Sequence, residues 1–169
     1  MNRWDDQPER TPRITDLQIH TTRLDSRANE PLMAFANAGA AAFGYTADLR
    51  LDGQLAQLLR LRVAQINNCT YCLDVHYGAA RDVGIPQVKI DCLTAWWETR
   101  LFSDAEQAAL EYAEALTRAS DTTVTKAFQQ YHDKLTIYFD EAAMLEIVAV
   151  VVNMNVWTRL KLAEGASPG

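Results

Sequence analysis

Apolar residues recur at every third or fourth position through most of the chain, and this spacing is that of amphipathic helices. No stretch shows the alternation of a half-buried strand, and no Asn-Gly turn joins two candidate strands. The spacing therefore predicts an all-α fold, a single-domain bundle of six to eight helices. The clearest stripe lies in the stretch 49–66 and carries Leu55, Leu58, Leu59, Val63 and Ile66.

Residues that favour helix ends divide this pattern into segments. Asp48 is placed to cap the helix over 49–66, and Ser103 with Glu106 has the spacing of a capping box. The helical domain is expected to span 15–162, after an N-terminal arm over 1–14 and before a flexible tail over 163–169. Helices are predicted over 31–43, 49–66, 69–82, 87–98, 104–118, 124–135 and 140–162.

Composition excludes several classes of function. The chain has 169 residues, 49% of them hydrophobic and 22% charged, which is enough for one packed core. Its net charge of −6, without a cluster of Lys and Arg, argues against a nucleic-acid partner. The first fifteen residues lack the pattern of a secretory signal, and the longest apolar run, 147–152, is too short for a membrane span. We therefore expect a cytoplasmic protein with no membrane partner.

The segment NNCTYCLDVH, residues 67–76, holds two of the three cysteines. Cys69 and Cys72 fall in the first turn of a predicted helix, where unpaired N–H groups lower the pKa of a nearby thiol. His76 lies one turn beyond Cys72 on the same face and can exchange a proton with it. A sulfenic acid formed on one cysteine can then close to a disulfide with the other. This arrangement is the one required of a thiol peroxidase or a disulfide reductase.

Three other interpretations of the two cysteines remain open. With His76 they supply three ligands of a zinc site, although no second pair of ligands follows at the usual spacing. They are alternatively buried structural cysteines, or the redox motif of a thioredoxin, whose βαβ context is missing here. Cys92 lies outside the motif and is interpreted as a buried small hydrophobe. We expect neither a bound metal nor a cofactor.

The motif and its flanks resemble a known family. The stretch LLRLRVAQINNCTYCLDVH over 58–76 is similar to the core of the alkylhydroperoxidase D-like branch of the carboxymuconolactone decarboxylase superfamily. The segments WWETRLFS over 96–103 and NMNVWTRL over 153–160 also resemble it, as does the alanine-rich helix between them. The resemblance covers about residues 30–163, most of the chain.

This resemblance implies an all-helical protein that assembles into homotrimers or homohexamers and reduces hydroperoxides. It implies that Cys72 attacks the hydroperoxide, Cys69 resolves the sulfenate as a disulfide, and His76 belongs to the proton relay. A thiol or a dihydrolipoyl-type partner is the electron donor that the resemblance implies. The decarboxylase branch is the nearest enzyme alternative, but its members do not rely on a dithiol of this kind.

Two positions depart from the relay of the best-known members. Gln57 stands where they have a glutamate, and Tyr71 stands where they have a histidine between the cysteines. Gln57 cannot carry a proton as a carboxylate does, although it can orient His76 or a water. Glu98 is the candidate substitute acid, with a helix-end salt bridge as its alternative role. The protein is thus predicted to be a thiol-dependent peroxidase slowed by the missing carboxylate, or alternatively a weakly active redox-responsive oligomer or small-molecule binding module.

Overall fold

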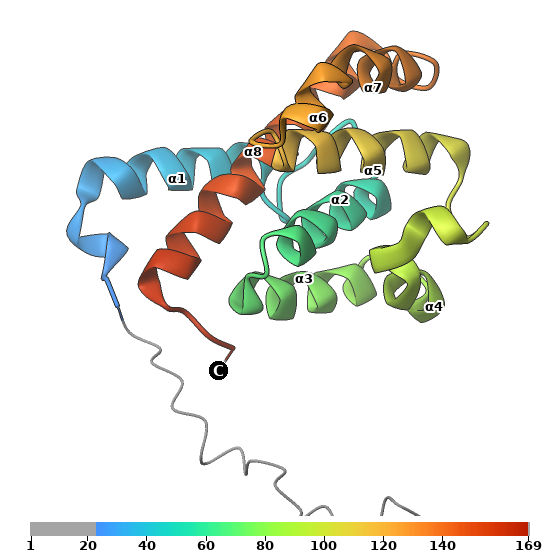
Figure 1. Cartoon of the computed structure of the whole chain (residues 1–169). Coiled ribbons are helices and arrows are strands. Elements are labelled where there is room, and N and C mark those ends of the chain that lie inside the picture. Colours follow the sequence, from blue (N-terminus) through green and yellow to red (C-terminus); the bar gives the residue numbers. More distant parts are fainter. Residues whose placement is uncertain (1–22, 169) are drawn as a thin grey trace, which may run out of the picture.

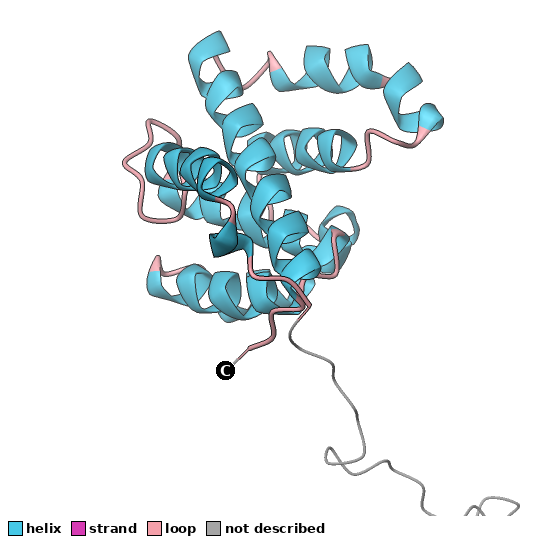
Figure 2. Ribbon diagram, turned by 90° about the vertical axis from the view of Figure 1, so that its left-hand side faces the viewer, coloured by secondary structure: helices cyan, strands magenta, loops and turns pink. Residues whose placement is uncertain are grey.

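The computed structural model describes residues 23–168 and contains only helices and connecting loops in that range (Figure 2). The all-α prediction is therefore confirmed. The N-terminal arm predicted over 1–14 lies outside the described residues. The helices in chain order (Figure 1) are η2 (Ser26–Ala28), α1 (Glu30–Phe43), α2 (Gly53–Ile66), α3 (Thr70–Asp82), α4 (Gln87–Asp91), η3 (Cys92–Glu98), α5 (Asp104–Thr117), α6 (Thr122–Lys126), α7 (Phe128–Leu135) and α8 (Glu141–Glu164).

Helix α2 lies at the centre of the bundle, between α3, α5 and α8 (Figure 1). Every residue from Leu55 to Ala64 is buried, so the helix has no solvent-facing side over these positions. Its core side chains Leu58, Leu59 and Leu61 are completely inaccessible to solvent. A helix buried all round holds its polar residues inside the protein as well. Gln57 and Arg60 are therefore carried into the interior by the same packing that buries the leucines.

Several predicted helix boundaries need correction. The second helix begins at Gly53 with Asp52 as its cap, not at residue 49 with Asp48. The backbone N–H groups of Arg50 and Leu51 instead donate to the Glu146 carboxylate of α8, at 3.2 and 2.8 Å, which holds this stretch outside a helix.

The helices predicted over 87–98 and 124–135 are each divided into two. The first is α4 followed by the 3₁₀ helix η3, which contains non-helical backbone at Ala95. The second is interrupted at Ala127, between α6 and α7. The capping box of Ser103 and Glu106 forms as predicted at the start of α5.

Helix α8 runs from Glu141 to Glu164 and ends at Gly165, whose φ of 70° is a left-handed conformation that favours glycine. Among the described helices, α8 alone is long and apolar enough to cross a membrane by length and composition. Its side chains at Ile147, Val150 and Val151 are buried in the bundle, where α8 contacts α1, α2 and α5. Core helices of this kind pass the same test of length and apolarity.

Candidate dithiol site

The two cysteines lie at the junction between α2 and α3. Asn68 ends the connection with a φ of 52°, a left-handed conformation that asparagine tolerates, and this turn sets the chain into α3. Cys69 is the N-cap of α3, and its Sγ accepts a hydrogen bond from the backbone N–H of Cys72 at 3.4 Å. Both side chains are buried, with 1% and 4% of the residue surface exposed. The thiols are free, as is that of Cys92.

The environment favours a thiolate on this pair. The pKa of Cys69 is lowered to about 7, chiefly because the Cys72 thiol hydrogen-bonds to its sulfur. The backbone N–H of Cys72 and the charge of Lys161 lower it further, while burial opposes them. The pKa of Cys72 is raised, because it is the donor to the Cys69 sulfur and because it is buried. The resting negative charge therefore sits on the capping sulfur of Cys69, one hydrogen bond away from Cys72.

His76 is held by Gln57 from α2. The Gln57 Nε2 lies 2.8 Å from the ring Nδ1 of His76 and also donates to the His76 carbonyl oxygen at 3.2 Å. The Gln57 Oε1 faces the other way and accepts from the Arg60 guanidinium at 3.4 Å. Because Arg60 can only donate and a carbonyl can only accept, this orientation of the amide satisfies both neighbours. Nδ1 is then an acceptor, and the ring proton of neutral His76 is on Nε2.

The imidazole of His76 is a neutral group at physiological pH. Burial lowers its pKa to about 4, and the nearby positive charge of Arg60 acts in the same direction. The ring of Tyr45 packs edge-on against it, with ring centroids 6.0 Å apart. Arg60 donates to the backbone carbonyls of Phe43 and Gly44, at 3.0 and 2.8 Å, which fixes the guanidinium at the end of α1.

A pocket of about 740 Å³ opens beside Cys72 and His76. Its walls come from η2, α1 and the loop after it, α2, α3 and α8, so residues far apart in the sequence enclose one space. The lining is mostly apolar and aromatic, and includes Met33, Tyr45, Tyr71, Val75, Met154 and Trp157. Such a pocket with a few polar groups is typical of a small-molecule site.

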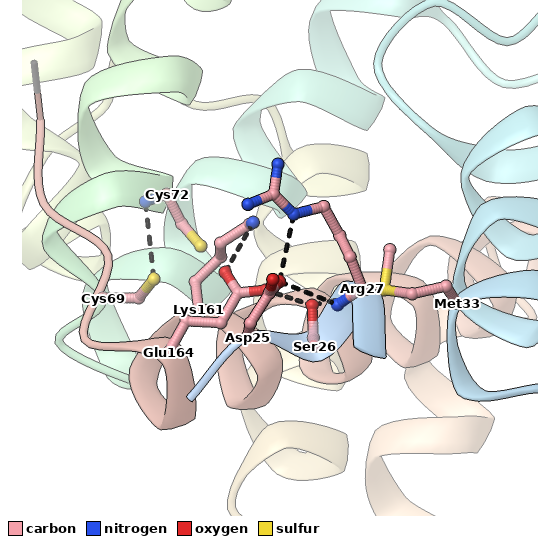
Figure 3. Close-up of polar contacts among 8 residues, drawn as sticks. All are labelled: Asp25, Ser26, Arg27, Met33, Cys69, Cys72, Lys161 and Glu164. Atoms are coloured by element: carbon pink, nitrogen blue, oxygen red, sulfur yellow. Dashed lines mark hydrogen bonds and ion pairs between the residues drawn. The ribbon is translucent and has the colours of Figure 1, made fainter. Parts of the chain in front are cut away.

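Charged residues of η2 and α8 form one rim of this pocket (Figure 3). Lys161 donates to Glu164 at 2.7 Å, and the Ser26 hydroxyl donates to the other oxygen of the same carboxylate. The backbone N–H of Arg23 also donates to the Glu164 carbonyl at 2.9 Å. The segment before α1 is thereby tied to the C-terminal end of α8.

Four of the five predicted site residues come together here: Cys69, Cys72, His76 and Gln57. The fifth, Glu98, is an exposed residue at the end of η3 and is not part of the pocket wall.

Tyr71 lines the pocket and is partly exposed. The sequence analysis does not identify Lys161 and Glu164 as site residues: Lys161 falls at the end of the helix predicted over 140–162, and Glu164 falls in the predicted tail over 163–169. The structure instead continues α8 to Glu164, and their spacing of three on one helix is the signal that could have paired them. Within residues 23–168, no three His, Cys, Asp or Glu side chains gather as metal ligands would.

Residues 31–115, half of the chain, match the model of the carboxymuconolactone decarboxylase family. The chain belongs to this family. A Bacillus subtilis relative, the uncharacterized protein YdfG, is 32% identical over 72% of this chain and 80% of its own length. Family membership thus rests on sequence as well as on fold.

Solved structures show the same fold. A protein of unknown function from Agrobacterium tumefaciens, provisionally described as the antioxidant defence protein AhpD, superposes with a TM-score of 0.77 at 22% identity. That match covers 88% of this chain and 99% of the other. The debrominase Bmp8 superposes with a TM-score of 0.63 at 19% identity, over 89% and 92% of the two chains. This chain therefore has the fold of the AhpD-like branch of the family.

Proposed function

We propose that this protein is a thiol-dependent peroxidase that reduces hydroperoxides with the Cys69–Cys72 dithiol. The observation that carries the proposal is the position of Cys72: it lines a largely apolar pocket and is hydrogen-bonded through its own backbone N–H to a sulfur that ionises near neutral pH. A thiolate is the nucleophile in peroxide reduction, and an apolar pocket suits an organic hydroperoxide.

Unpaired polar atoms support the pocket as a binding site. In the part of the chain that the structure describes, three buried side-chain atoms have no hydrogen-bond partner: Arg60 Nε, Asn153 Oδ1 and Trp157 Nε1. All three belong to residues of the pocket wall. Because buried polar groups are normally paired, orphaned ones are expected where a ligand or water belongs.

The reaction balances with the residues present. The Cys72 sulfur, after passing its proton to the Cys69 thiolate, attacks the outer oxygen of the hydroperoxide, and the O–O bond breaks. The leaving alkoxide takes up a proton and departs as an alcohol, while Cys72 becomes a sulfenic acid. The Cys69 thiol then attacks the Cys72 sulfur, which releases water and forms a disulfide. A hydroperoxide and two thiols give an alcohol, water and one disulfide.

The position of Cys69 at the helix end assists disulfide closure. Side chains three apart on a helix have Cβ atoms about 5–6 Å apart, whereas a disulfide needs about 3.5–4.5 Å. Cys69 is the N-cap, and only its carbonyl belongs to the hydrogen-bond ladder of α3, where it accepts from the Leu73 N–H at 2.8 Å. Its side chain can therefore rotate toward Cys72 without breaking that bond.

The electron donor must reach two sulfurs that are nearly inaccessible from the surface. We therefore propose a slender thiol donor, such as a dihydrolipoyl arm, that enters through the pocket. A protein whose cysteines must start the reaction as free thiols is suited to the reducing cytoplasm, where we expect it to act.

The decisive experiment follows consumption of an organic hydroperoxide by the reduced protein, with dihydrolipoamide as reductant. Cys72→Ser should abolish turnover, and Cys69→Ser should allow one turnover that leaves a sulfenic acid on Cys72, detected by mass spectrometry after trapping. Cys92→Ser is the matched control, because this third cysteine lies outside the pocket. Undiminished turnover in Cys72→Ser would show that the dithiol is not the reaction centre.

A second candidate is reductive dehalogenation of an aromatic compound. Two observations favour it: the fold shared with the debrominase Bmp8, and the three aromatic side chains Tyr45, Tyr71 and Trp157 in the pocket wall. Two thiols and an aryl bromide would give the dehalogenated ring, bromide, a proton and the disulfide. Release of bromide from a brominated pyrrole by reduced protein, without turnover of any hydroperoxide, would favour this candidate.

A further inference from the structure

The Cys69 thiolate is stabilised first by hydrogen bonds from the thiol and the backbone N–H of Cys72. His76 is neutral, and its Nδ1 is occupied by the Gln57 amide, so the ring presents an Nε2–H and cannot take a proton from a thiol. Neither Gln57 nor Tyr71 supplies a positive charge. A positive charge that adds to the hydrogen bonds from Cys72 must therefore come from another element.

Three cationic side chains line the described pocket: Arg27, Arg60 and Lys161. Arg60 is directed at the carbonyls of Phe43 and Gly44. Arg27 is bound to Asp25 at 3.0 Å, and its side chain is 83% exposed, so water screens its charge. Only the Lys161 ammonium remains partly buried and close to the start of α3.

Lys161 is held there by contacts on three sides. Its Nζ lies 5.1 Å from the centroid of the Tyr71 ring and 5.5 Å from that of the Trp157 ring. Tyr71 is the residue directly before Cys72, in the first turn of α3. Figure 3 shows the Lys161 side chain extending toward the side of α3 that carries Cys72. The side chain is 19% exposed, and the Glu164 carboxylate, 16% exposed, holds its far side. Electrostatic interactions are stronger where solvent is partly excluded.

We propose that Lys161 is the positioning residue that stabilises the thiolate of the Cys69–Cys72 pair, and that Glu164 moderates its effect. The inference rests on the proposed dithiol function. The hydrogen bond from Cys72 lowers the pKa of Cys69 most, and the charge of Lys161 lowers it further. The same charge opposes the contact with Cys69 and the burial that raise the pKa of Cys72. Because Glu164 is also bound to Ser26 of η2, contacts of the segment before α1 influence where the ammonium sits.

Other charged and titratable groups face the same pocket and enter the pH dependence. Helix α2 contributes Arg60, α3 contributes His76 and Tyr71, and the loop after α1 contributes Tyr45. The η2 segment contributes Asp25 and Arg27, which are bound to each other. These groups stay the same in every variant at position 161. A neutral side chain there should raise the thiol pKa, and another cationic side chain should keep it low, so the direction of the pKa change reports the charge at this position.

The test measures the thiolate directly, by ultraviolet absorbance of the reduced protein and by the rate of iodoacetamide alkylation as a function of pH. Lys161→Met should raise the pKa of the first thiol to ionise by about one unit, which slows alkylation below that pKa about tenfold. Lys161→Arg should restore most of the lost rate. Glu164→Gln keeps the hydrogen-bonding shape and should shift the pKa the opposite way, with faster alkylation.

Lys89→Met is the matched control. Lys89 is also a partly buried lysine, paired with Glu106 at 2.5 Å and lying 5.3 Å from the Phe102 ring, but it is outside the pocket. Its removal should leave the thiolate titration unchanged. If Lys161→Met fails to fold, Glu164→Gln decides: an unchanged or raised thiol pKa in that variant overturns the inference.

The two proposals fail separately. A thiol pKa that is unchanged in folded Lys161→Met, in a protein that does reduce hydroperoxide, overturns the role of Lys161 and leaves the peroxidase. A pKa that moves as described, in a wild-type protein that reduces no hydroperoxide, supports Lys161 and overturns the peroxidase.

Discussion

The Nε2 of Gln57 lies 2.8 Å from the Nδ1 of His76, in the buried space between α2 and α3. This contact decides the tautomer of the imidazole, because an amide N–H requires an acceptor. The Nε2–H of His76 can donate to a leaving oxygen or to a thiolate, but it cannot act as the base that a carboxylate partner would make of it. In this chain His76 is therefore a hydrogen-bond donor at Nε2.

Gln57→Glu should allow His76 to act as that base. A carboxylate facing Nδ1 would accept a hydrogen bond from it, so the ring proton would move to Nδ1. The carboxylate would also raise the pKa of His76 and leave Nε2 free to take a proton from a thiol. The adjacent guanidinium of Arg60 offsets the cost of the buried charge. We expect oxidation by a hydroperoxide to be about tenfold faster or more at neutral pH, measured by stopped flow.

Gln54→Glu provides the control for this change, because it adds the same charge to α2 at a residue that bonds to the carbonyl of Val83 instead of to the site. A rate that stays the same in Gln57→Glu would mean that His76 does not limit the reaction.

His76 should also make stability depend on pH. Its folded pKa of about 4 lies below the ordinary value of 6.5, so the unfolded chain binds more protons between these values. Stability is therefore retained above about pH 6.5 and lost as the pH falls toward 4, by about 3 kcal/mol from this one group. When the free energy of unfolding is measured in urea at a series of pH values, its fall between pH 6.5 and 4 should be smaller in His76→Gln than in the wild type. The same pH dependence of the unfolding free energy in the two proteins would contradict a buried, neutral histidine.

Glu114 should be a stability residue. Its carboxylate, 13% exposed, accepts from Arg62 Nε at 2.7 Å and from Trp96 Nε1 at 2.8 Å. Glu114→Ala would leave a buried guanidinium without its partner and should cost about 3–5 kcal/mol in the free energy of unfolding. Glu111 lies on α5 like Glu114, and Glu111→Ala breaks its more exposed pair with Lys134 of α7, which should cost about 1 kcal/mol or less. Similar losses in the two variants would show that burial of the pair is unimportant.

The face shared by α1 and α8 should be an interface between subunits. A groove of about 480 Å³ runs between these helices, and Phe35, Leu145 and Val152 on its walls are 63%, 62% and 52% exposed. Apolar surface gathered in this way usually marks an association site. We expect a homotrimer or homohexamer by light scattering, and Val152→Asp should dissociate it. A monomeric wild-type protein, or an oligomer that Val152→Asp leaves intact, would exclude this face.

Local sequence patterns predicted the secondary structure well where the signal was itself local. The capping box at Ser103 and the helix break at Asn67-Asn68 need only neighbouring residues, and both lie where they were expected. Helix α2 begins later than its local sequence predicts, because Glu146, almost a hundred positions further along the chain, binds the amides of Arg50 and Leu51. Glu98 is a candidate only through its place in a family-like segment, and no local pattern indicates that it lies outside the pocket.

The amino-acid order is sufficient to give the helical class, the family and the closeness of Cys69 to Cys72 at one helix start, because these depend on helical spacing and on a contiguous motif. The environment of the dithiol depends on packing between α2, α3 and α8. Folding brings Gln57 to His76 and Lys161 over Tyr71, contacts that join positions 19 and 90 residues apart. Charge and proton position act through space over a few ångströms, so tertiary packing determines how reactive these two cysteines are.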